Sequence, residues 1–260
     1  MAKGQPNTQK PRATKPRVDV IRIVPLHGAA AAEVAGAPPP QLTYRNGPLI
    51  GAVEVFTVFW GSAWSVAPQN AFIGQVNAFF DFVLTSPLID QLAEYNAGGM
   101  TIRHGKRTGT ITITTKLSSS VTDAAIQTFL KQQIAAKTLP KVTANALYFV
   151  YLPPGVRVVM GGSSSCQAFC GYHSSIGTTT FYAVMPYPGC SGCVGSNAAF
   201  DALTSTTSHE LCEAITDPIP GQGWYDDTNG EIGDICAWQT KKVGSYTVQL
   251  EWSNRAGRCL

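Results

Sequence analysis

The residues best suited to chemistry lie in one predicted helix, 199–217, where His209, Glu210 and Glu213 form the pattern H-E-x-x-E. At about 100° per residue, positions 209 and 213 share a helix face, so an imidazole and a carboxylate can converge on one ion. The pattern is a variant of the H-E-x-x-H zinc helix, in which the intervening glutamate takes a proton from water. We predict a zinc site with His209 and Glu213 as ligands and Glu210 as the general base.

A third ligand is needed, because a catalytic zinc ion normally has three protein ligands and a water. The segment "GEIGDIC", which follows the turn signal "NG", offers Glu231 and Asp234. We predict Glu231 as the third ligand, with Asp234 either replacing it or orienting His209. Asp217 lies about 12 Å beyond His209 along a straight helix and is predicted to cap the following loop.

Two further residues are candidates for contact with a substrate or a transition state, namely His173 in the predicted loop "CGYHSS" and Tyr225. The run "DDTNGE" (226–231) has the oxygen atoms of a calcium loop without the full EF-hand spacing. The simplest alternative for the whole motif is the solvated face of a surface helix, which would also carry His209 and Glu213.

These motifs carry a resemblance to a known family. The run "FCGYHSS…FYAVMPYPGCSGC…SHELCEAITDPIPGQGWYDDTNGEIGDICAW…VQLEWSN" resembles bacterial and fungal relatives of the EXORDIUM, or phosphate-induced, protein family, over roughly residues 165–254. The resemblance implies an exported, zincin-type metalloprotein. Plant members typically lack the His-Glu helix, so their biology does not carry an activity to this chain. The positions that match the bacterial type are His209, Glu210, Glu213, Asp217, Glu231 and Asp234.

The elements that must position these residues can be read from apolar periodicity. Pro87 should open a second helix within 69–95, with Ser86 as its cap. The order up to residue 155 is β-α-β-α-β, which predicts an α/β sheet with crossover helices. The predicted strands are 53–61, 108–117, 146–155, 178–188 and 246–254, and the predicted helices are 69–95, 121–137 and 199–217.

We therefore predict an α/β (α+β) fold, a zincin-like single domain over residues 49–260. It has a mixed twisted sheet, packed helices, the active helix beneath an edge strand and a Cys-rich loop region. Residues 1–48 are predicted to be a disordered basic tail followed by an extended lead-in.

The seven cysteines all lie in the C-terminal part of the chain. Cys166, Cys170, Cys190 and Cys193 lie in Gly/Ser-rich segments and are predicted to be oxidised in pairs, with a zinc ion held by four thiolates as the alternative. We also predict that a bond between Cys212 and Cys236 ties the active helix to "GEIGDIC".

The amount and distribution of charge limit the kinds of partner that the protein can bind. Only 13% of the residues are charged, against about a quarter in a typical protein. The net charge of +3 comes from five bases in residues 1–17, and the remainder has 14 basic and 16 acidic residues. This pattern predicts no nucleic-acid partner, and no apolar run has the length of a membrane span.

We predict a secreted or cell-surface protein with a peptide or protein substrate, and the sequence carries no signal for an oligomeric state. The alternative function is a non-catalytic extracellular binding or signalling protein with a structural metal.

Overall fold

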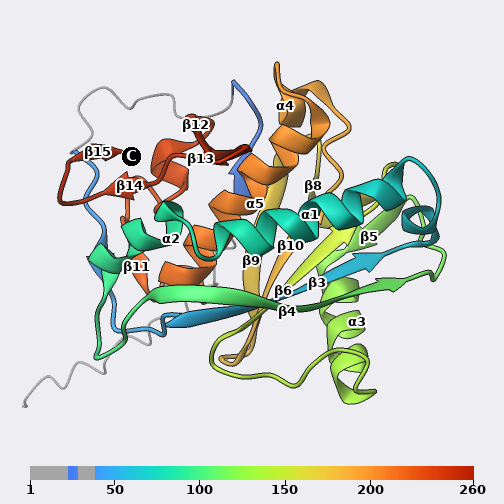
Figure 1. Ribbon diagram of the computed structural model, residues 1–260, viewed down its shortest axis with the longest axis horizontal. Coiled ribbons are helices and arrows are strands. Elements are labelled where there is room, and N and C mark those ends of the chain that lie inside the picture. Colours follow the sequence, from blue (N-terminus) through green and yellow to red (C-terminus); the bar gives the residue numbers. More distant parts are fainter. Residues whose placement is uncertain (1–22, 29–38) are drawn as a thin grey trace, which may run out of the picture.

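The computed structural model describes residues 23–28 and 39–260, and its centre is a six-stranded mixed sheet in the order β1-β9-β10-β6-β3-β4 (Figure 1). Strands β10, β6, β3 and β4 run parallel, whereas β9 is antiparallel to both of its neighbours. This sheet confirms the predicted α/β class. Its strands are β1 (Ile23–Pro25), β3 (Ala52–Trp60), β4 (Arg103–Ile113), β6 (Ala146–Leu152), β9 (Phe169–Ile176) and β10 (Thr180–Pro186).

Helices cover both faces of this sheet. Strand β6 is buried along its whole length, and its side chains alternate between two cores, so that Phe149 and Val150 face opposite sides. One core contains α1 (Gln69–Val83), α2 (Pro87–Gln91) and α5 (Ala199–Thr216), and the other contains α3 (Asp123–Ala135). The site helix α5 therefore lies between the sheet and the remaining elements of its own face.

The predicted β-α-β-α-β order is confirmed by β3, α1, β4, α3 and β6 in sequence. The break after α1 also has the predicted cause. Ser86 accepts a hydrogen bond from the Leu88 backbone N–H, and Pro87 occupies the first turn of α2.

The smaller elements surround this framework. The hairpin of β12 (Thr240–Val243) and β13 (Tyr246–Gln249) packs on α5, where Ser208 Oγ accepts a hydrogen bond from the Gln249 backbone. The other elements are β2 (Thr43–Tyr44) with β11 (Trp224–Tyr225), β5 (Ser120–Thr122) with β7 (Arg157–Met160) and β8 (Ser163–Ser164), β14 (Trp252–Ser253) with β15 (Arg258–Cys259), α4 (Ser191–Val194), and the 3-10 turns Ser62–Ser65, Leu92–Tyr95 and Asp234–Cys236.

The loop predicted around His173 is wrong, because residues 169–176 form strand β9. Small and polar residues disguised this strand, and their role becomes visible only in the tertiary structure. A Cβ atom on Gly171 would lie 2.8 Å from Thr206 Cγ2, closer than real atoms approach. The small residue in β9 therefore lets α5 lie directly on the sheet.

The active helix does not lie beneath an edge strand, because β10 is inside the sheet and α5 packs across β9 and β10. The lead-in itself supplies the edge. Residues 23–25 form β1 and pair with β9, while residues 43–44 form β2 and pair with β11. The predicted basic tail and part of the lead-in, residues 1–22 and 29–38, lie outside the described residues.

Three disulfides are present, Cys166–Cys190, Cys170–Cys193 and Cys236–Cys259. The first two confirm the predicted pairing of the four loop cysteines, and together the three bonds indicate an oxidising compartment. The predicted bond between Cys212 and Cys236 is wrong, because Cys236 pairs with Cys259 and Cys212 is a buried free thiol.

This pairing makes a simple prediction for alkylation without reductant. We expect no labelled thiol in the native protein, since Cys212 has no exposed surface, and one after unfolding. Mass spectrometry reads the number directly, and full reduction of the same sample, which should label all seven cysteines, is the control. Four or more labelled thiols before reduction would contradict the disulfides.

Within the described ranges, no single helix is long and apolar enough to cross a membrane, and only the bent pair Gln69–Val83 and Pro87–Tyr95 meets the length and composition together.

Candidate metal centre

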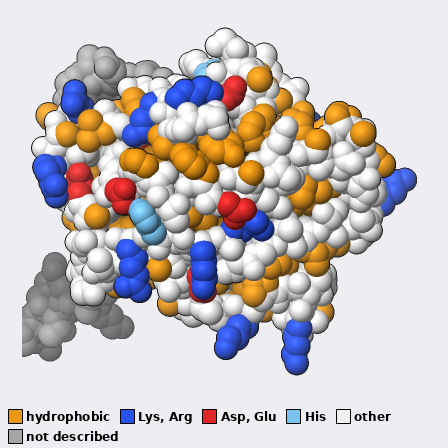
Figure 2. Space-filling model, in the orientation of Figure 1, with side chains coloured by type: hydrophobic (Ala, Val, Ile, Leu, Met, Phe, Trp, Pro, Cys, Tyr) orange, Lys and Arg blue, Asp and Glu red, His pale blue; other side chains and the backbone are white. Residues whose placement is uncertain are grey.

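All residues of helix α5 from Ala202 to Thr216 are buried, and His209, Glu210 and Glu213 have no exposed surface. The alternative of a solvated helix face is therefore wrong. Acidic side chains visible on the face in Figure 2 are spread singly, whereas those around α5 gather inside the protein. Buried charges of this kind are costly unless they are paired or coordinate a cation.

His209 and Glu213 converge as their helical spacing predicts. The His209 Nε2 atom lies 3.0 Å from Glu213 Oε1, without hydrogen-bond geometry. The Asp234 backbone N–H donates to the same Glu213 oxygen at 3.1 Å. Possible ligand atoms of His209, Glu213 and Asp234 all lie within 4.8 Å of one another, and Asp234 is the only half-buried member of this first group.

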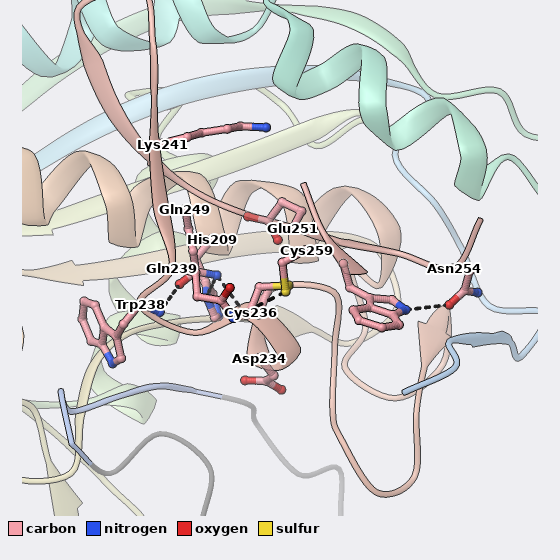
Figure 3. Close-up of a disulfide and its surroundings, with 12 residues drawn as sticks. His209, Asp234, Cys236, Trp238, Gln239, Lys241, Gln249, Glu251, Asn254 and Cys259 are labelled. Carbon is pink, nitrogen blue, oxygen red and sulfur yellow. Dashed lines mark hydrogen bonds between the residues drawn. A yellow bond between two sulfur atoms is a disulfide. The ribbon is translucent and has the colours of Figure 1, made fainter. Parts of the chain in front are cut away.

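Gln249 on β13 holds the other side of the His209 ring, and sequence reasoning missed it. Its Nε2 lies 2.8 Å from His209 Nδ1 and also donates to Gly233 O, while its Oε1 accepts from the Trp238 backbone N–H. Figure 3 shows Gln249 against the His209 ring, next to the Cys236–Cys259 disulfide. No motif marked this residue, since only the approach of β13 to α5 brings it there.

His173 lies on β9, directly under α5, so no loop has to fold across the site. Its Nδ1 lies 3.2 Å from Glu210 Oε2 and 3.5 Å from Glu213 Oε2. Its Nε2 lies 3.1 Å from the backbone oxygen of Asp217. His173, Glu210 and Glu213 form a second group of possible ligand atoms within 4.8 Å, and all three residues are fully buried. The two groups share Glu213, one through each of its oxygens.

Glu231 belongs to neither group. Its Oε1 lies 3.5 Å from His173 Nε2, on the opposite side of that ring from Glu210 and Glu213. Burial, together with the charges of Glu213 and Asp217, raises the pKa of Glu231 well above its usual range. The structure thus places Asp234, and not the favoured Glu231, beside His209 and Glu213.

Asp217 takes the predicted role of a loop cap. Its carboxylate accepts hydrogen bonds from the backbone N–H groups of Gly221, Gln222 and Gly223. The chain turns tightly enough that a Cβ atom on Gly223 would lie 2.3 Å from Thr216 O. This turn fixes the Asp217 backbone oxygen that faces His173.

Tyr225 and the predicted calcium loop do not belong to either group of possible ligands. Tyr225 lies on β11, where the Arg45 guanidinium stacks on its ring at 4.4 Å. In the predicted calcium loop, the Asp226 carboxylate accepts hydrogen bonds from the backbone N–H groups of Gln41, Thr228 and Asn229. Its oxygens therefore serve the turn itself.

The charge of the cluster is strongly unbalanced. In the described part of the chain, the ion pairs of Glu210, Glu213 and Glu231 are with His173 and His209 alone. Burial alone would lower the pKa of His173, but Glu210 and Glu213 outweigh it and raise this pKa to about 10. Several buried oxygen atoms have no hydrogen-bond partner among the described residues, namely Glu210 Oε1, Glu213 Oε2 and both carboxylate oxygens of Glu231. Imidazole nitrogen and carboxylate oxygen are zinc ligands, so these donors fit a divalent cation.

No protein-family model and no curated protein significantly matches this sequence. The resemblance to the EXORDIUM family therefore stays a prediction, and the geometry of the centre has to carry the functional argument.

Proposed function

We propose that this protein is a zinc-dependent hydrolase that cleaves peptide bonds, with its metal centre at Glu213 on α5. One observation carries the proposal: two histidines and several carboxylates converge in a largely buried cluster in which oxygen atoms lack hydrogen-bond partners among the described residues. A cation is the simplest group that satisfies such a set, because it replaces the missing positive charge and the missing hydrogen bonds together.

Two ligand sets are compatible with this cluster. The first contains His209, Glu213 and Asp234, and the unpartnered His209 Nε2 favours it. The second contains His173, Glu210 and Glu213, and the unpartnered Glu213 Oε2 favours it. Either set supplies three protein ligands, the number expected where a fourth position is kept for water.

Zinc, when bound, would supply Lewis acidity and lower the pKa of a nearby water molecule. The protein groups must then orient the substrate and move its protons. In the first set Glu210 is not a ligand and can take a proton, as predicted from the motif. In the second set Glu210 is a ligand and His209 is the neighbouring residue left to exchange a proton. A peptide would approach on the side of Asp234, which is the half-buried member of the cluster.

A second candidate function is the non-catalytic binding or signalling protein with a structural metal. The burial of the centre favours it, since His173, His209, Glu210 and Glu213 all have no exposed surface. A metal enclosed in this way holds α5 to β9 without reaching a substrate.

Metal analysis and chelation separate these functions. We expect protein purified without added metal to contain zinc, and to cleave an unfolded protein substrate such as casein. Chelation should stop the cleavage, and added zinc should restore it. Zinc without any cleavage, together with unfolding on chelation, would favour the structural metal. A chain that binds no zinc would contradict both functions.

The three disulfides also bear on location. They suit a protein that works outside the cytosol, so we propose a secreted or cell-surface protein, in agreement with the resemblance noted in the sequence.

A further inference from the structure

We infer that the ion is bound by His173, Glu210 and Glu213, and that His209, the first residue of the motif, is a positioning residue and not a ligand. The inference rests on the proposed function, since it assigns the ligands of the same centre. It reverses the roles that the H-E-x-x-E pattern suggests, because the intervening glutamate becomes a ligand.

His173 is already arranged for ligation. Its Nε2 lies 3.1 Å from the Asp217 backbone oxygen, which can only accept a hydrogen bond. Nε2 therefore carries a proton in either charge state of the ring, and the Nδ1 proton, which faces Glu210 without zinc, is the one that a bound ion would displace. Metal-binding histidines commonly donate their other N–H to a backbone carbonyl in this way, which fixes the tautomer and the direction of the ring.

The distances among these three residues also suit a shared ion. For zinc–ligand bonds of about 2.0–2.2 Å in a tetrahedron, neighbouring ligand atoms lie about 3.3–3.6 Å apart. His173 Nδ1 lies 3.2 Å from Glu210 Oε2 and 3.5 Å from Glu213 Oε2, close to this range. Glu213 Oε2 faces His173, is fully buried, and has no hydrogen-bond partner among the described residues.

His209 has the opposite arrangement. The Gln249 amide is fixed by Gly233 O, which can only accept, and by the Trp238 backbone N–H, which can only donate. The orientation that satisfies both contacts directs the amide N–H at His209 Nδ1, 2.8 Å away. Nδ1 is therefore an acceptor, and the proton of the neutral ring lies on Nε2. A protonated Nε2 cannot bind a metal.

Turning the Gln249 amide would free Nε2 for a metal, but it would place an oxygen against Gly233 O and an NH₂ group against the Trp238 N–H. The turned amide would lose its hydrogen bonds with Gly233 and Trp238 and keep only the one with His209. Nε2 instead lies 3.0 Å from Glu213 Oε1, a charge contact without hydrogen-bond geometry. His209 thus acts through Glu213, holding one oxygen while the other faces His173.

Nitrogen NMR of the histidine rings in the wild-type protein tests this assignment directly. Four histidines are present, and His27 and His104 can be identified by substitution because they lie outside the centre. We expect His209 to show an Nε2–H tautomer both without zinc and with zinc. The Nδ1 resonance of His173 should shift on zinc binding while its Nε2 keeps the proton. A zinc-dependent shift of His209 Nε2, with the proton on Nδ1, would overturn the inference and leave the proposed function intact.

Zinc affinity of variants provides the second measurement, by competition with a chromogenic chelator. We expect His173→Ala to weaken zinc binding about 100-fold or more, and His209→Ala to weaken it about 10-fold, as for residues that only orient ligands. The reverse order would refute the assignment.

Gln249→Glu is a further discriminating variant, because a carboxylate would draw the His209 proton to Nδ1 and free Nε2. If His209 were a ligand, this change would strengthen zinc binding; we expect it to weaken binding. Wild-type protein that binds no zinc would refute the proposed function and this assignment together.

Discussion

Glu213→Gln is expected to lower zinc affinity by about three orders of magnitude or more, the largest effect of any single change in the centre. Both ligand sets use this carboxylate, one through each oxygen. A glutamine of the same shape would present one neutral oxygen and an NH₂ group that cannot bind a metal. Competition titration with a chromogenic chelator measures the loss, and hydrolytic activity should disappear with the metal.

Glu251→Gln is the matched control for this result. Glu251 is also a fully buried glutamate, and its oxygens have no hydrogen-bond partner within residues 23–28 and 39–260, but it belongs to neither ligand group. We expect its substitution to change zinc affinity by no more than a few-fold. If Glu213→Gln binds zinc as tightly as the wild type, no centre at α5 exists. Equal losses in both variants would indicate a general effect of buried charge.

The sequence predicted the framework well where periodicity and end signals were strong. The strand at 53–61 and the helix at 121–137 correspond to β3 and α3, and Ser86 caps α2 as its type suggests. Strand β9 was missed because small and polar residues interrupt its apolar pattern, one of them for a tertiary reason. Gly171 is needed where α5 approaches, and no pattern within the strand reports a helix that follows 28 residues later in the chain.

Local sequence patterns also do not report the tertiary contacts of the candidate metal centre. Helical spacing brought His209, Glu210 and Glu213 together, because those contacts are local to one helix. His173 and Gln249 come from β9 and β13, and only strand order and hairpin packing place them on opposite sides of α5. The positions of Glu231 and Asp234 relative to the helix also depend on local turns that sequence separation does not report. The 3-10 turn that begins at Asp234 puts its backbone N–H, and not Glu231, against Glu213.

Removal of zinc is expected to lower the melting temperature by roughly 8–16 °C. A ligand present at about 1,000 times its dissociation constant stabilises the folded state by about 4 kcal/mol. For a domain of this size, each kcal/mol corresponds to roughly 2–4 °C. Without the cation, the ion pairs that Glu210, Glu213 and Glu231 make with residues 23–28 and 39–260 are those with His173 and His209. Differential scanning calorimetry of the protein with zinc and after chelation measures the change.

Glu213→Gln again supplies the matched comparison. Its melting temperature should not depend on zinc, because the ion no longer binds. In the absence of zinc it should melt below the wild type. Burial alone would raise the pKa of Glu213, but His209 and His173 outweigh it and lower this pKa to about 2, so the neutral glutamine loses two favourable ion pairs. A wild-type protein that binds zinc yet melts at the same temperature after chelation would show that the cation does not balance the buried charge. The carboxylates would then have to be neutralised by protons alone, and the electrostatic reason for placing a metal at α5 would be lost.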